Sequence, residues 1–238
     1  MKVKPLLQSI NPSNFLQDYL QACGVKDVEE YLNAGLDVMD SPWDYPNMKE
    51  GVERLHTAIS CGEQIGILQD VDSDGVMSAT IAYDFLKKQG VQPIVFWHTG
   101  KQHGISPSKD EDMLQQIIDS GITLLWIPDA GSGDVNPCKE LKKLGIDAII
   151  TDHHLAKKNP YAIVINCHFG EGLNSNLTGA GVTDKFIEGY CEKYGTERPD
   201  YSDLVAFSLI SDVADLTSLE NRAYMNNANR NYEQFVNN

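Results

Sequence analysis

The sequence predicts an α/β fold with a mainly parallel sheet flanked by helices, preceded by a helical N-terminal extension. Short apolar runs alternate with amphipathic stretches of about a dozen residues from residue 65 onward. Strands and helices that alternate in this way form βαβ units, and right-handed crossovers place helices on both faces of the sheet. The expected strands are IGILQ (65–69), PIVFW (93–97), ITLLWI (122–127), IDAIIT (146–151) and YAIVIN (161–166).

Helices are expected between these strands and at both ends of the chain. Apolar residues recur at i+4 over 77–85, and further helical stretches cover 110–121 and 136–145. The chain reads as helical again from residue 178. The three expected parts are a helical extension over 1–60, the α/β domain over 61–220, and the start of a connecting helix or tail over 221–238.

The charge of the chain limits its partners. Its 238 residues are 42% hydrophobic, enough to bury a proper core, and carry a formal net charge of −15. A protein this acidic has no overall electrostatic attraction for nucleic acid. Binding to a polyanion therefore requires local positive charge, bound divalent cations or a segment beyond this chain.

The cysteines and the apolar runs indicate the compartment. Five cysteines are scattered along the chain without CxxC spacing, which predicts a reduced setting with neither a zinc site nor a disulfide framework. No apolar run approaches the roughly 18 residues that span a membrane. The N-terminus has no apolar stretch long enough for a signal peptide. We therefore expect a cytoplasmic protein without a membrane partner.

Acidic and imidazole side chains follow three of the expected strands. In parallel sheets, ligands bind outside the carboxyl ends of the strands, so these side chains are expected at one edge of the sheet. A fourth acidic cluster lies in the apolar stretch LVAFSLISDVADL, where a carboxylate needs a partner. The four clusters are Asp70, Asp72 and Asp74 after the first strand, Asp129 after the third, Asp152-His153-His154 after the fourth, and Asp212 with Asp215.

Each cluster also has a simpler explanation. DVDSDG matches the start of an EF-hand loop, but the twelfth position is Ile81 instead of Glu, and a strand rather than a helix precedes it. One aspartate of that stretch could cap the following helix, although three are more than a cap needs. Asp129 alone could be a turn residue, the histidine pair a solvated loop, and Asp212 a partner of a nearby lysine. Their coincidence at one sheet edge favours a shared metal site.

The ligand types indicate which metal. Carboxylates with one or two imidazoles and no thiolate suit Mn²⁺ or Mg²⁺ better than zinc. Four or five carboxylates suit two ions, roughly 3.5–4 Å apart, that activate water and clamp both oxygens of an in-line displacement at phosphorus. The sequence contains no GxSxG elbow and no GxxxxGK[ST] loop. It therefore predicts a two-metal phosphodiesterase.

At these residues the chain resembles the DHH phosphoesterase family, named for the triplet that stands here at 152–154. It is most similar to the RecJ-like, single-strand-specific exonuclease branch. The motif DVDSDG, the lead-in over 41–68, LTGAGVTDKF (177–186) and LVAFSLISDVADLTSLENR (204–222) carry the resemblance. Other branches more often have a histidine where this chain has Leu68.

The resemblance implies roles for individual residues. It makes two divalent cations, Mn²⁺ or Mg²⁺, the expected cofactors, with Asp129 as the bridging carboxylate. His154 is expected to hold the scissile phosphate or assist proton transfer, and Asp70 to act beside the metals. The remaining expected residues are the metal ligands Asp72, Asp74, His153 and Asp212, and the substrate-binding Lys101, His103, Gly104, Gly179 and Gly181.

The implied activity is 5′→3′ hydrolysis of single-stranded DNA to 5′-mononucleotides. The chain departs from the family in TGKQHGISPS (99–108), where Lys101 or His103 must replace the usual arginine, and in the expected absence of the second domain that closes over the cleft. That domain is expected to be truncated or separately encoded. Two alternatives stay open: a phosphodiesterase for short oligonucleotides or cyclic dinucleotides, and a non-catalytic scaffold that binds a protein partner.

Overall fold

A five-stranded sheet forms the centre of the molecule. The structure, a computed structural model, describes residues 6–7, 11–98, 103–105 and 113–237. The strands lie in the order β2-β1-β3-β4-β5, and all four neighbouring pairs are parallel, which confirms the predicted fold class. The strands are β1 (Ile65–Gln69), β2 (Ile94–Trp97), β3 (Leu124–Pro128), β4 (Asp147–Asp152) and β5 (Ile163–Asn166).

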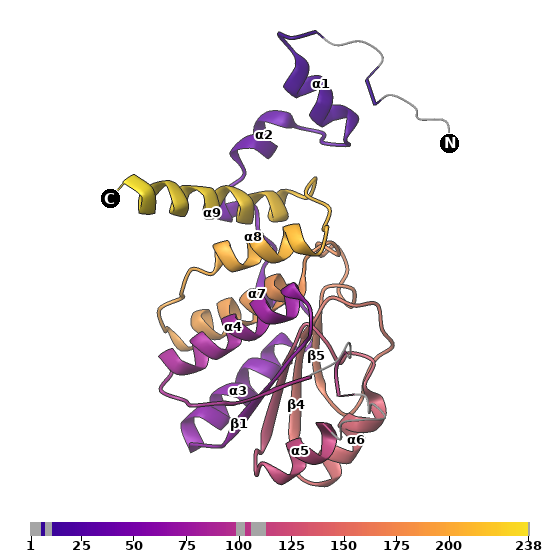
Figure 1. The fold of residues 1–238 in the computed structure, drawn as a ribbon, viewed down its shortest axis with the longest axis vertical. Coiled ribbons are helices and arrows are strands. Elements are labelled where there is room, and N and C mark those ends of the chain that lie inside the picture. The colour runs from indigo at the N-terminus through magenta and orange to yellow at the C-terminus, as the bar shows by residue number, and fades with distance from the viewer. Residues whose placement is uncertain (1–5, 8–10, 99–102, 106–112, 238) are drawn as a thin grey trace.

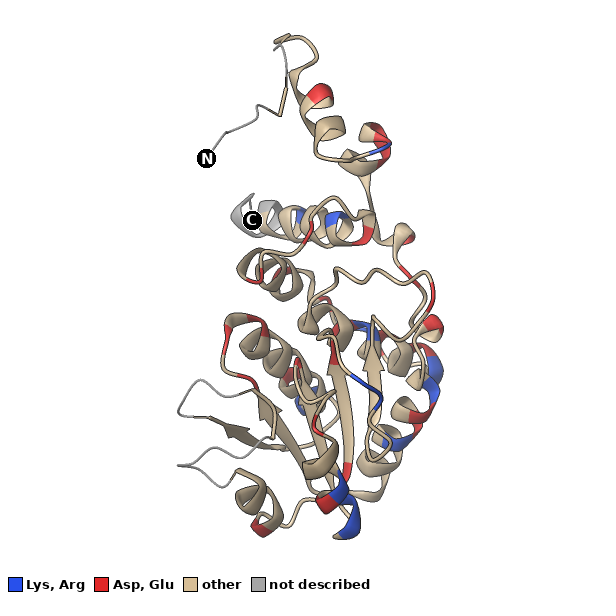
Figure 2. Cartoon of the chain, turned by 90° about the vertical axis from the view of Figure 1, so that its right-hand side faces the viewer, with Lys and Arg blue, Asp and Glu red and all other residues tan. Residues whose placement is uncertain are grey.

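Helices cover both faces of the sheet (Figures 1 and 2). The chain runs from β1 outward to β2 and then returns past β1 to β3, so successive right-handed crossovers put their helices on opposite faces. One face carries α3 (Met48–Cys61), α4 (Ser73–Lys88) and α7 (Gly179–Tyr194), and the other carries α5 (Met113–Asp119) and α6 (Val135–Lys143).

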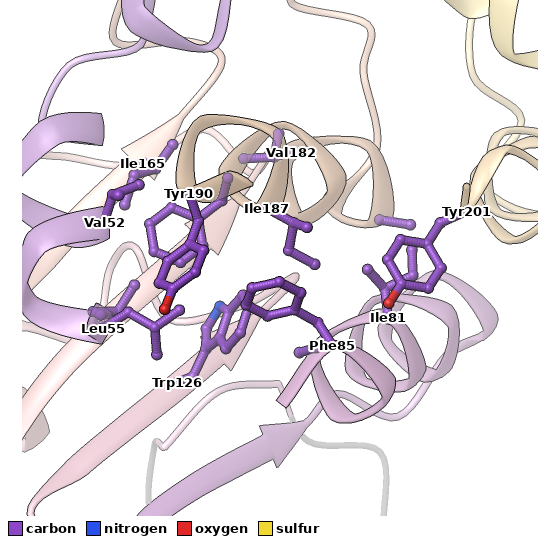
Figure 3. Close-up of a cluster of buried hydrophobic side chains, with 14 of the residues drawn as sticks. Val52, Leu55, Ile81, Phe85, Trp126, Ile165, Val182, Ile187, Tyr190 and Tyr201 are labelled. Carbon is purple, nitrogen blue, oxygen red and sulfur yellow. The ribbon is translucent and has the colours of Figure 1, made fainter. Parts of the chain in front are cut away.

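The two faces bury separate hydrophobic clusters because side chains alternate along each strand. In β3, Trp126 points toward the α3/α4/α7 face, while Leu125 and Ile127 point to the opposite face. The Trp126 ring packs edge-on against Phe186 of α7 at 5.2 Å between ring centres, and Figure 3 shows this layer around it. The Trp126 Nε1–H donates to Thr151 Oγ1 at 3.1 Å, so the buried indole is satisfied.

Helix α3 belongs to the core rather than to a separate extension. Its apolar face, which includes Met48, Val52 and Leu55, is fully buried in the same cluster as Trp126. The helix that the sequence analysis assigned to the extension before residue 61 therefore shares its core with the sheet. The sequence pattern identified the amphipathic face of α3 but could not show which partner buries it.

The remaining helices form a layer beyond α4 and α7. Asn226 of α9 donates to the carbonyls of Leu32 and Ala34 at 3.2 and 2.9 Å, which ties the α2 region to α9. Helix α1 buries no residue and lies far from the sheet (Figure 1). These helices are α1 (Phe15–Ala22), α2 (Val28–Asn33), α8 (Ser202–Ser211) and α9 (Leu219–Asn237), with short 3₁₀ turns at Leu36–Val38 and Pro42–Asp44.

Buried charges on α7 bind this outer layer to the domain. Lys185 is fully buried, and its Nζ donates to the Asp40 carbonyl at 2.6 Å and pairs with Glu220 at 3.0 Å. The neighbouring Asp184 accepts from Arg198 and from the Tyr224 hydroxyl, each at 2.8 Å. No described helix is long and apolar enough to cross a membrane.

Candidate metal centre

The acidic and imidazole clusters meet at the carboxyl ends of the strands, near the point where the strand order changes direction between β1 and β3. Strand β1 lies between β2 and β3, so the loops after β1 and β3 diverge and leave a crevice at their carboxyl ends. Asp70 follows β1, Asp129 follows β3, and Asp152 ends β4. The structure thus brings together side chains that are far apart in the sequence.

His153 lies at the centre of this cluster. Its Nε2 is 3.3 Å from Asp129 Oδ1, 3.6 Å from Asp74 Oδ2 and 3.8 Å from Asp212 Oδ2. One imidazole nitrogen therefore faces three carboxylates from three separate segments. This is the arrangement expected of side chains that share a cation.

Asp129 is the most unusual residue of the site. It is fully buried, and neither carboxylate oxygen has a hydrogen-bond partner among the described residues. Its backbone is left-handed, with φ of 68°, which is uncommon for a non-glycine residue and turns the chain sharply after β3. Burial and the neighbouring Asp74 raise its pKa well above the ordinary value. A buried carboxylate without hydrogen bonds is the group that a cation would satisfy.

Asp74 is fixed by the start of helix α7. Its two oxygens accept from the backbone N–H groups of Gly179 and Ala180 at 2.7 and 2.9 Å, and Ser78 also donates to it. The amides at a helix N-terminus favour a negative charge there. An alanine Cβ at Gly179 would lie 2.7 Å from the Asp129 Cα, so only glycine allows α7 to approach this closely. Gly179 thus shapes the site.

Asp70 and Asp72 form a second group with His103. The Asp70 carboxylate is buried, its Oδ2 lies 2.5 Å from His103 Nδ1, and its Oδ1 has no partner among the described residues. Burial raises the Asp70 pKa against the opposing effect of His103. Asp72 is exposed and caps α4 by accepting from Gly75 N at 3.0 Å.

The turn that carries His103 is anchored from two sides. Gly104 has φ of 70°, and its carbonyl lies 2.7 Å from His98 Nε2. The Ile105 N–H donates to Asp134 Oδ2 at 2.6 Å. Gly104 therefore serves a tight turn that holds the His103 ring against Asp70.

Asp152 is a functional candidate that the sequence analysis did not assign a role. Its buried Oδ1 accepts from His153 N, His154 N and His154 Nδ1 at 2.7, 3.0 and 2.8 Å, and its Oδ2 accepts from Ser132 N at 3.1 Å. These bonds hold the Asp152 pKa down at about 2 despite its burial. The hydrogen bond to Asp152 raises the His154 pKa to about 9. The sequence feature that could have identified Asp152 is its position directly after a run of buried-strand residues and directly before two histidines.

We expect Asp152→Asn to release the His154 ring while the fold persists. The amide has one acceptor oxygen and no charge, so it cannot hold both the loop amides and an imidazolium. The His154 pKa should then fall from about 9 toward the ordinary histidine value, measured by NMR titration of the metal-free protein. A His154 pKa that stays unchanged would show that other groups set it.

The other expected site residues occupy different positions. Asp212 caps the C-terminus of α8 with its side chain 38% exposed, and burial raises its pKa while His153 opposes that shift. Asp215 points elsewhere and accepts from Thr217. Gly181 donates to Thr178 Oγ1 at 3.4 Å and packs on Leu177, so in the structure it serves the helix start. Lys101 lies outside the described residues.

The donor atoms fit divalent cations. Three sets of side chains each offer ligand atoms within 4.8 Å of one another, and all consist of carboxylates and imidazoles. All five cysteines are free thiols, and none belongs to these sets. Oxygen and imidazole donors without sulfur suit Mn²⁺ or Mg²⁺. The sets are Asp129, His153 and His154; Asp74, His153 and Asp212; and Asp70, Asp72 and His103.

Several characterised or named proteins that are similar to this chain are described as single-strand-specific DNA exonucleases. The chain is 32% identical over 231 residues to the single-stranded-DNA-specific exonuclease RecJ of Bacillus subtilis, covering 93% of this chain and 28% of that protein. It is 29% identical over 223 residues to YorK, a protein of the SPbeta prophage in the same species whose name describes a candidate single-strand DNA-specific exonuclease. That match covers 91% of this chain and 37% of YorK. The chain therefore spans about a third of the length of these relatives.

Solved structures and a family model agree with this similarity. RecJ from Thermus thermophilus in complex with Mn²⁺ superposes with a TM-score of 0.71 at 25% identity, covering 84% of this chain and 28% of that one. A second exonuclease RecJ, bound to manganese, gives a TM-score of 0.69 at 25% identity over 77% of this chain and 47% of that one. The model of the N-terminal domain of the DHH family matches residues 64–209. This protein therefore belongs to the DHH family.

Proposed function

We propose that this chain is a metal-dependent phosphodiesterase that hydrolyses single-stranded DNA from the 5′ end and releases 5′-mononucleotides. The observation that carries the proposal is the buried Asp129 carboxylate, which lacks a hydrogen-bond partner among the described residues and lies against His153. The named activity of similar proteins supports the choice of substrate. The proposal concerns the chain with these residues, whatever further domains accompany it.

Two divalent cations, Mn²⁺ or Mg²⁺, would be held by residues from four segments. When bound, such ions supply Lewis acidity toward water and toward a phosphate oxygen. Asp129 is best placed to serve both ions, because both of its oxygens are free of hydrogen bonds from the described residues and it is fully buried in the site. The ligands that we assign are Asp72, Asp74, Asp129, His153 and Asp212.

His154 is assigned to the substrate. Its Nδ1 is bound to Asp152, and its side chain is 50% exposed beside the buried cluster. The Asp152 contact favours the protonated ring, so His154 can donate to a phosphate oxygen or to a leaving oxygen. Asp152 positions this ring, and Asp70 positions the His103 ring, whose centre lies 6.4 Å from that of His154.

A second candidate substrate class follows from the charge. Among the described residues, Lys and Arg are dispersed over several elements in Figure 2, and the net charge of the chain is −15. Long single strands bind mainly through positively charged grooves that follow the backbone. A short oligonucleotide or a cyclic dinucleotide needs only the metals and a few local contacts. Asp74, Asp129 and Asp212 all lie close to His153, and this grouping of the expected metal ligands argues against the alternative of a non-catalytic scaffold.

Substrate competition tests the proposal. The chain is incubated with Mn²⁺ and a 3′-labelled single strand, alone or with excess duplex DNA, linear dinucleotide or cyclic dinucleotide. We expect a ladder shortened from the 5′ end, 5′-mononucleotides as products and no reaction after chelation. Exclusive cleavage of the dinucleotides would select the second candidate. No hydrolysis of any substrate with Mn²⁺ or Mg²⁺ would overturn the proposal.

We expect His154→Ala to lose turnover while it keeps most of its Mn²⁺ affinity. The ring is assigned to substrate, so its removal leaves the five assigned metal ligands in place. Calorimetric Mn²⁺ titration and single-strand hydrolysis are measured on the same preparation, with His168→Ala as the control because no candidate metal set among the described residues includes His168. If His154→Ala loses the metal entirely, His154 is itself a ligand.

A further inference from the structure

An exposed tryptophan ends the edge strand next to the candidate metal centre. Trp97 is the last residue of β2 and is 60% exposed. In the parallel register it lies beside Gln69, the residue that precedes Asp70. Because neighbouring strands lie about 4.8 Å apart, the indole is at the same edge of the sheet as Asp70, one strand farther out.

The geometry of the strand explains why the Trp97 side chain reaches solvent. Phe96 is buried in the cluster on the α5/α6 face, so the next residue, Trp97, points toward the opposite face. Helix α4 packs on that face mainly over β1 and β3, whereas β2 is the outermost strand. The indole therefore lies on the face that carries α4, whose first turn contributes Asp74 to the metal centre.

The chain contains three tryptophans, and the other two are bonded within the protein. Trp126 donates to Thr151, and the Nε1–H of Trp43 donates to Glu192 Oε2 at 2.7 Å. The Trp97 indole has no hydrogen bond and no aromatic contact among the described residues. A tryptophan is normally placed where its large apolar surface is buried. Packing within the chain therefore gives no reason for this residue, and its ring is available to a ligand.

The backbone on both sides of the indole is fixed. Trp97 pairs with β1, and the following residue, His98, is buried with its Nε2 2.7 Å from the Gly104 carbonyl oxygen. The same turn places His103 against Asp70. An aromatic ring on a rigid strand loses little conformational freedom when a ligand stacks on it.

The acidic charge of the chain favours an uncharged contact with substrate at this position. Asp70 and Asp72 follow the neighbouring strand, and the net charge of the chain is −15. Aromatic side chains bind the flat faces of unpaired bases, and this stacking requires no positive charge on the protein. Stacking can therefore contribute affinity for a single strand where cationic contacts to phosphate are scarce.

We propose that Trp97 is a stacking platform for an unpaired base of the substrate, on a nucleotide neighbouring the one that reacts. Two strand spacings, roughly 10 Å, separate β2 from β3, which carries Asp129, so the stacked base lies outside the reacting nucleotide. Bases inside a duplex are already stacked on their neighbours, so this contact favours single strands. The proposal rests on the proposed function for its substrate, but stacking itself requires no hydrolysis.

The direct test is a titration of tryptophan emission in the metal-free protein with a short single-stranded oligothymidylate. Stacking should quench the emission of wild type and of the matched control Trp43→Phe, and Trp97→Phe should lose this quenching. An abasic strand of equal length and charge should not quench, and a blunt duplex should quench weakly. If Trp97→Phe is quenched as strongly as wild type, the base does not stack on Trp97.

Steady-state hydrolysis with Mg²⁺ tests the same contact in the reaction. Trp97→Ala should raise the KM for the oligothymidylate about tenfold at little change in kcat, because stacking contributes binding to substrate and transition state alike. The ratio of the two KM values should persist at high salt, since stacking releases no counterions. Trp43→Ala should keep the wild-type KM, because Glu192, the partner of Trp43, lies roughly 20 Å along α7 from Gly179. Melting temperatures establish that each variant is folded.

The outcomes separate the platform from the proposed function. Quenching at Trp97 without hydrolysis of any strand would leave the platform standing and remove the nuclease proposal. Hydrolysis with an unchanged KM in Trp97→Ala would overturn the platform and leave the nuclease proposal standing. Sedimentation of the DNA-free protein as a dimer that Trp97→Ala dissociates would show that the indole belongs to an interface between copies, which would also overturn the platform.

Discussion

Asp129→Asn should abolish Mn²⁺ binding and hydrolysis while making the metal-free protein more stable. The substitution keeps the shape of the side chain and puts a neutral amide in place of a fully buried carboxyl, whose pKa is raised by burial and by Asp74 because its ionised form is disfavoured there. Removing the cost of burying this ionisable group should raise the free energy of unfolding by about 2 kcal/mol. Calorimetric Mn²⁺ titration, urea unfolding in chelator and a single-strand hydrolysis assay measure the three effects.

Asp215→Asn is the matched control for this result. Asp215 lies three residues from Asp212 in the sequence, but it is exposed and its side chain accepts hydrogen bonds only from Thr217 among the described residues. Its replacement should change the free energy of unfolding by less than about 0.5 kcal/mol and leave metal binding intact. Wild-type Mn²⁺ affinity in Asp129→Asn would show that the metals are not organised around Asp129.

Gly179→Ala should disrupt the site and the fold together. The new methyl would lie 2.7 Å from the Asp129 Cα and closer still to the Asp129 side chain, so α7 must move away from β3. That movement breaks the hydrogen bonds from Gly179 and Ala180 to Asp74. We expect the free energy of unfolding to fall by about 3 kcal/mol and hydrolysis to fall by more than about 100-fold.

Gly195→Ala separates this clash from the general effect of replacing a helix-end glycine. Gly195 caps the other end of α7 with φ of 65°, and a Cβ there would meet no atom within 4 Å. Only backbone strain remains, at a cost of about 1 kcal/mol, and hydrolysis should persist. Unfolding and hydrolysis are measured side by side. Equal losses in both variants would mean that the approach of α7 to Asp129 is unimportant.

The parallel sheet could be predicted from the sequence, and so could the grouping of the loops after β1, β3 and β4 at one edge of it, because both follow from local patterns. Alternating strands and helices imply a parallel sheet, and parallel strands bring Asp70, Asp129 and Asp152 to one edge. The sequence motifs also supplied the candidate ligands His153 and Asp212. These inferences need only periodicity and the direction of each strand.

The contacts between distant segments could not be predicted in this way. The bonds from α7 amides to Asp74 join residues 105 and 106 positions apart, and they depend on how closely two helices pack. The same holds for His103 against Asp70 and for α3, whose apolar face gives no sign of its partner. The left-handed backbone at Asp129 is likewise imposed by tertiary packing, since aspartate does not require it.

The strand order has a consequence for how the protein acquires its site. Every strand pair in the sheet is parallel, and the central pair β1–β3 joins strands that are separated in the sequence by α4, β2 and α5; such non-local pairings form slowly. Asp70 and Asp129 become neighbours only when β3 pairs with β1. A cation therefore cannot bind carboxylates from both loops before these two strands have paired. Metal affinity should appear in the last kinetic phase, as a signal that the central strands have paired.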